Sequence, residues 1–262
     1  MSARDVGSEL DGIRGIVLDV DDTIVDTRSS MIEAGAAAMA ALWPERTGEH
    51  SAMAQRYYTD PARWFARYAS GEVEFTSMRR GRLDEVASAF SVALPPDGHG
   101  AFESAYAPAF RAAQRLFSDV DALLDAADDL GIPRVLLTNS SAEATAVKLE
   151  VLAITHRFGA VVTTDTLGVG KPDPRTYLEA CRLAGTTPAD TVCIGDNLEW
   201  DVLGARAAGL RAVWIDRDGT VAGPELPAVP TVRSLGELTT VLRGGDLGRR
   251  PGMGSISSRF TS

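Results

Sequence analysis

Short runs of consecutive apolar residues recur along the chain, and between them lie segments with an apolar residue at every third or fourth position. A continuous apolar run is typical of a strand buried on both faces, and the longer repeat is typical of a helix with one buried face. Repeated strand and helix units predict a doubly wound α/β fold with a parallel sheet and right-handed crossovers. The expected strands are residues 15–18, 135–137, 160–163, 191–194 and 212–215.

Residues 28–116 break this alternation, because they contain helix patterns and almost no strand pattern. Within them, Asp60-Pro61 has the composition of a helix start, and Gly71 is placed to end that helix. We therefore expect an α-helical domain inserted into the α/β core. The expected divisions are a discontinuous core of residues 12–27 and 117–242, an inserted helical cap of residues 28–116, and flexible termini at residues 1–11 and 243–262.

Polar residues follow the carboxyl ends of several expected strands. Asp19 and Thr138 each come directly after an apolar run, and Asp196 ends a further one. Lys171 lies in a loop that leads away from another strand. Ligands of open α/β sheets bind outside these strand ends. Four separate segments are therefore expected to converge on one site.

The acidic residues of the first segment suit a division of labour. Asp19 and Asp21 are two positions apart, so an extended backbone directs both carboxylates to the same side. A metal ion would keep Asp19 ionised as a nucleophile, while Asp21 could carry and deliver a proton. Magnesium commonly takes one or two carboxylates, and Asp19 and Asp196 can supply them.

The remaining polar residues suit the binding of a phosphate group. The hydroxyl of Thr138, with Asn139 and the backbone N–H groups that open the next helix, forms an expected anion site. Lys171 adds a positive charge, and Asp201 could orient Lys171 or a metal-bound water. Taken singly, Thr138 or Asn139 would be a helix cap and Lys171 a solvated loop residue. The functional interpretation rests on the whole set.

Composition narrows the class of protein. The 262 residues are 45% hydrophobic and carry a formal net charge of −10, with no basic stripe suited to a phosphate backbone, so we expect no nucleic-acid partner. No run of about 18 apolar residues predicts a membrane span, and residues 1–10 lack the apolar stretch of a signal peptide. We therefore expect a cytoplasmic protein with no membrane partner. Two cysteines, Cys181 and Cys193, are too few for a disulfide framework.

The motifs, in their order along the chain, resemble those of the haloacid dehalogenase (HAD) superfamily, in its phosphatase branch. The resemblance covers roughly residues 12 to 220. The first motif of that family, an apolar strand followed by Asp-x-Asp-x-Thr, is met by Asp19, Asp21 and Thr23. The other three motifs are a strand ending in Thr or Ser, a Lys-Pro pair, and Gly-Asp-x-x-x-x-Asp. They match Thr138, Lys171-Pro172, and Gly195, Asp196 and Asp201.

The resemblance implies a Rossmann-like core, a mobile cap of the helical C1 type and Mg²⁺ as cofactor. It implies that Asp19 attacks phosphorus, and that the backbone carbonyl of Asp21 joins Asp19 and Asp196 around the metal. Asp22 stands where many members have glycine. Dehalogenases of the family lack the Asp-x-Asp pair, so Asp21 argues for phosphorus chemistry. Supporting roles are expected for Thr23, Asp201 and Asn197, the last of which stands where many members have serine.

Substrate choice is expected to lie with the cap, because the core meets only the phosphate. A turn at Gly71-Glu72 could reach over the site. Three nearby arginines could then contact an anionic or polyol leaving group, although such side chains commonly cover a surface. These are Arg79, Arg80 and Arg82.

The expected partner is a small phosphorylated metabolite, such as a sugar phosphate or phosphoglycolate. Two alternatives stay open: a β-phosphoglucomutase-like phosphomutase, which would return the phosphoryl group to its substrate, and a catalytically silent binding or regulatory protein on the same fold. The sequence also leaves open whether the protein is a monomer or a homodimer.

Overall fold

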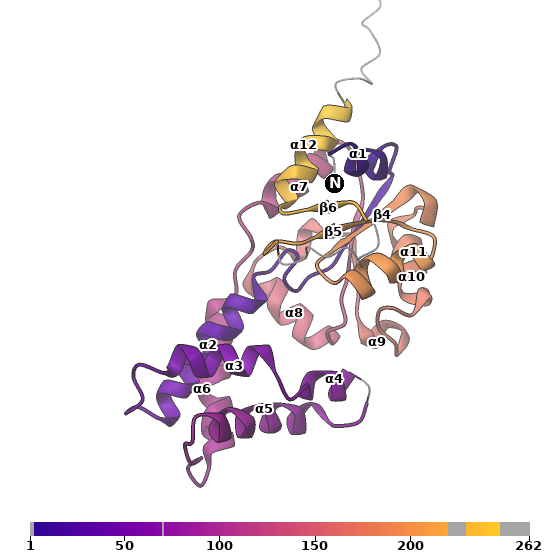
Figure 1. Ribbon diagram of the computed structural model, residues 1–262. Coiled ribbons are helices and arrows are strands. Elements are labelled where there is room, and N and C mark those ends of the chain that lie inside the picture. Colours follow the sequence, from indigo (N-terminus) through magenta and orange to yellow (C-terminus); the bar gives the residue numbers. More distant parts are fainter. Residues whose placement is uncertain (1–2, 70, 220–228, 247–262) are drawn as a thin grey trace, which may run out of the picture.

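The structure is a computed structural model that describes residues 3–69, 71–219 and 229–246, and it has two lobes (Figure 1). The α/β lobe contains a sheet covered by helices, and the helical lobe is formed by part of the chain between the first two strands. The strands are β1 (Gly15–Leu18), β2 (Arg134–Leu137), β3 (Ala160–Val162), β4 (Thr191–Gly195), β5 (Arg211–Ile215) and β6 (Thr231–Val232).

The sheet is parallel throughout its described strands, in the order β3-β2-β1-β4-β5-β6. β1 lies at the centre, where Val17 is opposite Val135 of β2 on one side and Cys193 of β4 on the other. The strand order reverses direction at β1, and ligands of doubly wound sheets bind at such a point. The predicted doubly wound parallel sheet is confirmed. The short edge strand β6 was not expected.

Helices cover both faces of the sheet because successive strand residues point to opposite sides. Ile16 and Leu18 pack in one apolar cluster with α1, α7 and α12, and Val17 packs in a second cluster with α10 and α11. The helices of this lobe are α1 (Ala3–Leu10), α7 (Val120–Asp129), α8 (Ala142–Val151), α9 (Thr164–Leu167), α10 (Pro174–Ala184), α11 (Gly204–Ala207) and α12 (Leu235–Asp246). Shorter helical turns span Thr155–Arg157, Pro188–Asp190 and Leu198–Leu203.

The amino-terminal segment differs from the expectation. Residues 1–11 were predicted to be flexible, but residues 3–10 form α1. Val6 and Leu10, four positions apart on one helical face, are buried against the α/β core. At the other end, α12 extends to Asp246, beyond the predicted boundary at residue 242, and residues 247–262 lie outside the described residues.

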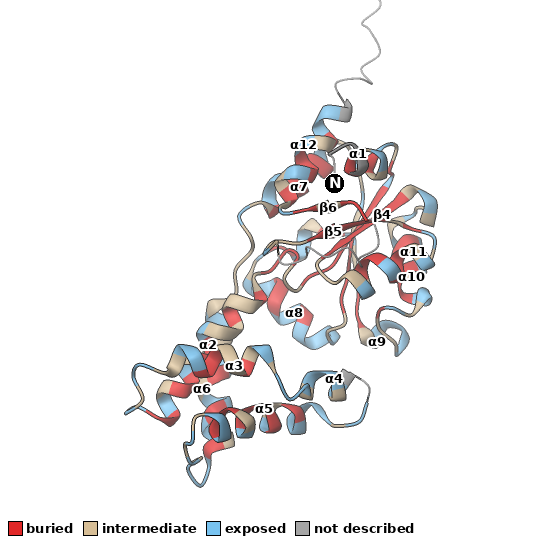
Figure 2. Ribbon diagram, viewed as in Figure 1, coloured by how far each residue is buried: buried red, intermediate tan, exposed pale blue. Residues whose placement is uncertain are grey.

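The helical lobe has its own apolar core, and the residues buried in it are the red segments of its helices in Figure 2. Met39, Tyr57 and Phe102 are fully buried there, and Tyr57 and Phe102 have ring centroids 5.1 Å apart. The helices are α2 (Thr27–Leu42), α3 (His50–Thr59), α4 (Trp64–Ala69), α5 (Phe75–Ala89) and α6 (Gly98–Ala113).

Helix α4, which follows α3, begins later in the chain than predicted. Asp60 ends α3 in the left-handed conformation, and its carboxylate then accepts hydrogen bonds from the backbone N–H groups of Trp64 (3.0 Å) and Phe65 (2.7 Å). Asp60 is therefore a cap, as expected, but α4 starts at Trp64 rather than at Pro61.

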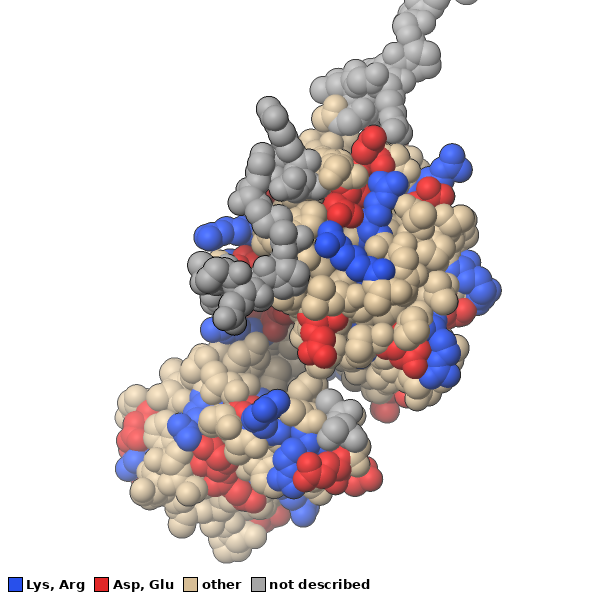
Figure 3. Space-filling model, turned by 45° about the vertical axis from the view of Figure 1, so that its right-hand side comes forward, with Lys and Arg blue, Asp and Glu red and all other residues tan. Residues whose placement is uncertain are grey.

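The surface shows how the lobes meet. On the face in Figure 3, a hollow separates the two lobes, and basic and acidic side chains are interspersed.

Across the described residues, no helix combines the length and the apolar character that crossing a membrane requires.

Candidate active site

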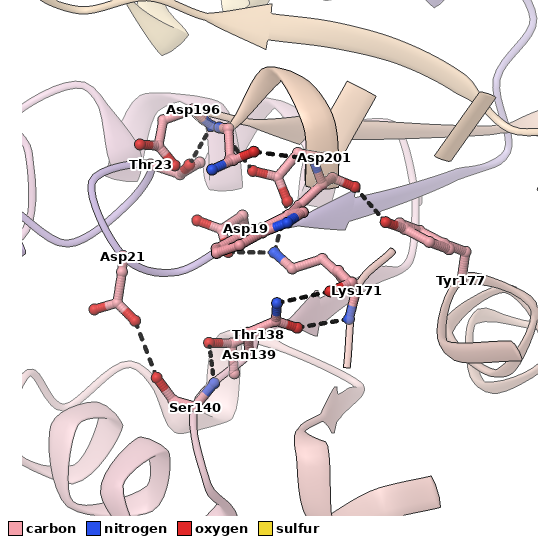
Figure 4. A network of polar contacts seen from close by, with 12 residues as sticks. Asp19, Asp21, Thr23, Thr138, Asn139, Ser140, Lys171, Tyr177, Asp196 and Asp201 are labelled. Atoms are coloured by element: carbon pink, nitrogen blue, oxygen red, sulfur yellow. Dashed lines mark hydrogen bonds and ion pairs between the residues drawn. The ribbon is translucent and has the colours of Figure 1, made fainter. Parts of the chain in front are cut away.

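The predicted site residues lie at the carboxyl edge of the central strands (Figure 4). Asp19 follows β1, Thr138 follows β2 and Asp196 follows β4. Because β1 pairs with both β2 and β4, the three strand ends are neighbours. The parallel register thus brings together residues more than a hundred positions apart in the chain.

Lys171 joins two carboxylates below the sheet edge. Its Nζ atom lies 2.6 Å from Asp19 Oδ1 and 2.6 Å from Asp201 Oδ1, and only 3% of its side chain is exposed. Burial disfavours the ammonium form, but the two carboxylates outweigh burial and raise the pKa of Lys171. Lys171 is therefore a fixed positive charge beside Asp19.

Asp201 is a support for Lys171 and for the motif loop. Its Oδ2 atom accepts a hydrogen bond from the backbone N–H of Asn197 at 2.9 Å, and Asn197 in turn accepts one from Trp200 to begin the helical turn Leu198–Leu203. A Cβ atom on Gly195 would lie 2.2 Å from the Asp201 carboxyl carbon. Only glycine at that position allows Asp201 to fold back under the strand end.

Burial gives Asp19 and Asp196 unusual proton affinities. Desolvation raises the pKa of Asp19 to about 7, although Lys171 opposes the shift. Desolvation and the nearby Asp19 raise the pKa of Asp196 to about 8. Thr23 Oγ1 fixes the backbone of Asp196 by accepting from its N–H at 3.0 Å. Within the described residues, no side chain donates a hydrogen bond to the Asp196 carboxylate.

These carboxylates suit a divalent cation. Oxygen atoms of Asp19, Asp196 and Asp201 lie within 4.8 Å of one another. Asp201 is already held by Lys171 and Asn197, whereas Asp196 has no such donor, so Asp19 and Asp196 are the better candidate ligands. Carboxylate oxygens are the hard ligands that magnesium prefers. When ionised, Asp19, Asp21, Asp196 and Asp201 carry four negative charges, and two buried lysines, Lys171 and Lys148, pair with three of these residues. One divalent cation would balance the two negative charges that remain.

Asp21 is held apart from Asp19. Figure 4 shows its side chain directed towards Ser140, whose Oγ donates to Asp21 Oδ2 at 3.2 Å. Thr27 Oγ1 donates to Asp21 Oδ1 at 2.6 Å, and Lys148 forms an ion pair with the same oxygen. Burial alone would raise the pKa of Asp21, but Lys148 and the two hydroxyl donors lower it below its ordinary value. Sequence reasoning did not identify Lys148.

The residues after β2 divide their roles differently from the prediction. Thr138 Oγ1 accepts from the backbone N–H of Ser140 at 3.1 Å, which leaves the hydroxyl hydrogen able to meet an anion. Asn139 was expected to bind phosphate. Instead its amide donates to the backbone oxygen of Lys171 (2.9 Å) and accepts from the Lys171 N–H (2.6 Å), so it holds the Lys171 loop in place.

The three predicted specificity arginines lie elsewhere in the helical lobe. Arg82 is 5% exposed and donates from Nε to the backbone oxygen of Tyr57 at 2.8 Å. Arg79 pairs with Glu103 at 2.6 Å, 4.4 Å above the Tyr106 ring. Arg80 is exposed. Because all three belong to α5, the packing of α5 on the lobe core directs them away from Asp19, and the structure does not bring them to the site.

A pocket of about 400 Å³ lies beside Asp196 between the two lobes. Asp22 enters it from the α/β lobe with a positive φ of 59°, and Tyr58 enters it from α3. The Tyr58 hydroxyl donates to Asp22 Oδ2 at 3.4 Å. Arg28 lines the same pocket and pairs with Asp218. This pocket adjoins the site, and it could hold the part of a substrate that lies beyond the group bound at Asp19.

Sequence and structure together define the family. The family model of haloacid dehalogenase-like hydrolases matches residues 13–209, and the chain belongs to this family.

Relatives of the chain include phosphatases and dehalogenases. The phosphoserine phosphatase of Thermus thermophilus is 36% identical over 204 residues, which are 76% of this chain and 76% of the relative. The (S)-2-haloacid dehalogenase 4A of Burkholderia cepacia is 27% identical over 248 residues, or 89% of this chain and 96% of the relative. Among solved structures, the magnesium-bound HAD-hydrolase YfnB from Bacillus subtilis matches with a TM-score of 0.68 and 22% identity, over 88% of this chain and 98% of that chain.

Proposed function

We propose that the protein is a magnesium-dependent phosphatase that hydrolyses a small phosphomonoester through an aspartyl-phosphate on Asp19. The observation that carries this proposal is the pairing of Asp19 with Lys171 beside Asp196, whose carboxylate lacks a donor among the described residues. Phosphoryl transfer depends mainly on positioning and charge neutralisation, and this arrangement suits both needs. The identity to a phosphoserine phosphatase supports the same reaction class.

The chain's own residues divide the steps. A carboxylate oxygen of Asp19 attacks phosphorus as the bond to the leaving-group oxygen breaks, and Asp21 gives a proton to that oxygen. Water then attacks the aspartyl-phosphate while Asp21 takes its proton, which releases phosphate and restores Asp19. Lys171 and the Thr138 hydroxyl hold the phosphoryl oxygens.

Asp19, Asp196 and the backbone carbonyl of Asp21 are the proposed magnesium ligands, and a bound magnesium ion would neutralise charge on the phosphoryl group. Their oxygen chemistry and the two unbalanced negative charges of the site support this assignment. We place substrate selection in the pocket beside Asp196 and Tyr58, and the helical lobe acts as a cap over it.

A panel of phosphomonoesters tests the proposal. Sugar phosphates, phosphoglycolate and phosphoserine are offered with and without magnesium to the parent protein and to Asp19→Asn. We expect metal-dependent phosphate release, and a loss of at least ~10³-fold in the variant because the nucleophile is gone. Turnover that survives in Asp19→Asn, or that ignores a chelator, would contradict the proposal. Activity that appears only when a sugar bisphosphate is added would instead favour a phosphomutase.

Dehalogenation is the second candidate, because a dehalogenase relative covers most of the chain. In that reaction Asp19 would attack carbon and displace halide. Asp21 and its donors argue against it, since displacement of a halide needs no proton delivered to the leaving group. Halide release from 2-chloropropionate in a chelator would favour the dehalogenase.

A further inference from the structure

The chain uses lysine at two positions. Of its 26 basic residues, Lys148 and Lys171 are lysines and the others are arginines. Both lysines are buried, and each pairs with one aspartate of the first motif: Lys171 with Asp19, and Lys148 with Asp21. Both lysines of the chain therefore lie at the candidate active site. Lys171 has a role in the proposed mechanism, and Lys148 has none so far.

Lys148 reaches Asp21 from a different element than the other donors. It lies on α8, its side chain is 10% exposed, and its Nζ atom contacts Asp21 Oδ1 and lies 3.5 Å from Thr27 Oγ1. Thr27 is the first residue of α2, where the helical lobe begins, and Ser140 lies in the loop before α8. Three segments thus hold one carboxylate.

The chemistry of the side chain suits this position. An ammonium group is a compact point charge, and it fits among the oxygens of Asp21 and Thr27 where a planar guanidinium would need more room. Its full positive charge also attracts the Asp21 carboxylate more strongly than either neutral hydroxyl does. Lys148 is the member of the group that can fix where the Asp21 carboxylate points.

We infer that Lys148 is a positioning residue for Asp21, which orients the carboxylate that exchanges protons with the leaving group and with water. The inference rests on the proposed phosphatase function. Lys148 does not touch the phosphoryl group in this account, and acts only through Asp21. Thr27 and Ser140 share the task as weaker partners.

A double-variant cycle tests the inference. With the best alkyl phosphate of the panel as substrate, Lys148→Met is expected to lower kcat about 10-fold or more, because proton delivery contributes at least that much, with KM changed less than about 3-fold. Asp21→Asn should cost more. The double variant should be no slower than Asp21→Asn alone, since Lys148 then has no proton carrier to orient.

Three further variants sharpen the cycle. Lys148→Arg keeps the charge and should retain part of the activity. Thr27→Val removes a weaker partner, should cost less than Lys148→Met, and should cost nothing in the Asp21→Asn background. Arg157→Met is the matched control, because Arg157 pairs with Asp125 and Asp128 on the surface, and its kcat should equal that of the parent.

Two kinetic outcomes would overturn the inference. One is a Lys148→Met loss that appears in full in the Asp21→Asn background, which would indicate an independent role. The other is a loss confined to KM, which would mean that Lys148 binds substrate directly. Either leaves the proposed function intact, because that function fails if the parent protein is inactive, if Asp19→Asn is active or if turnover ignores a chelator.

A crystal structure of Lys148→Met gives a readout that needs no activity. The Asp21 carboxylate is expected to leave its position beside Ser140 and Thr27 while Asp19 and Lys171 stay in place. An unmoved Asp21 carboxylate in that structure would overturn the inference, whatever the kinetics show.

Discussion

Two aspartates only two positions apart have opposite shifts in pKa. Asp19 is buried with one lysine shared between two carboxylates, and burial raises its pKa to about 7. Asp21 has a lysine of its own and two hydroxyl donors, which lower its pKa despite burial. Environments that separate the proton affinities of neighbouring acids are a mark of acid–base sites. Without a metal, these shifts favour a proton on Asp19 and an ionised Asp21, so the proposed nucleophilic role of Asp19 requires a bound cation that keeps it ionised.

This electrostatic arrangement predicts how magnesium and pH act together. Asp19 and Asp196 have pKa values of about 7 and about 8 in the folded protein, against an ordinary value of 3.8. Between pH values of about 4 and about 8, the metal-free folded state therefore binds more protons than the unfolded state does. Its free energy of unfolding should fall as pH rises from about 4 to about 8. The pKa of Asp21 is shifted in the opposite direction, so Asp21 makes the free energy of unfolding rise with pH, but only at pH values below about 3.8.

A magnesium ion that binds the ionised pair should reverse this loss. Binding displaces protons, so the magnesium-induced rise in unfolding temperature should be larger near pH 8 than near pH 6. Thermal melts in chelator and in magnesium at both pH values measure the difference. Asp196→Asn is the control and should lose most of the rise. A magnesium effect that is equal or larger at the lower pH would count against Asp19 and Asp196 as ligands.

At the level of single helices, α5 contains arginines that the sequence suggested for substrate binding, but one of them has a structural role instead. Arg82 donates to the backbone oxygens of Tyr57 (2.8 Å) and Tyr58 (3.0 Å) in the last turn of α3. Helix ends leave such carbonyl groups without intrahelical partners, so Arg82 completes the end of α3. Arg80, two positions away, points to solvent.

These two arginines should respond differently to substitution. Arg82→Met leaves the α3 carbonyl groups buried without donors, and it should lower the free energy of unfolding by about 1–3 kcal/mol. Arg80→Ala should change it by less than about 0.5 kcal/mol. Urea denaturation measures both, and rates across the phosphomonoester panel should keep their ranking in each variant. A changed ranking in a fully stable Arg80→Ala protein would restore the specificity role that the structure removes.

The strand ends were predictable from sequence, whereas pairings between elements were not. A buried apolar run followed by an acid fixes both the strand and the place of Asp19, because parallel strands end at one edge. Ser141 caps α8, whereas Ser140, one position earlier, contacts Asp21 on another element. Asn139 and Lys148 face partners on other elements, and no spacing within their own segments reveals such contacts. For Lys148 the usable signal was composition, since it is one of two lysines.

At the scale of the whole molecule, the site lies where the two lobes meet. Asp22 and Tyr58 form a hydrogen bond from one lobe to the other, and the pocket between them adjoins Asp196. Thr27 stands at the root of the helical lobe and contacts Asp21. A movement of the helical lobe would thus change both the substrate pocket and the contacts of Asp21, the proposed proton carrier. This coupling suits a cap that closes on its substrate.

In the proposed mechanism, the phosphoryl group passes through Asp19. The most direct measurement is rapid acid quench of the protein during turnover, followed by intact-mass and peptide mass spectrometry. We predict a transient mass gain of one phosphoryl group on the peptide that contains Asp19, which is absent without magnesium and absent in Asp19→Asn. A modified residue other than Asp19, or turnover with no phosphoprotein in a quench faster than kcat, would contradict the account.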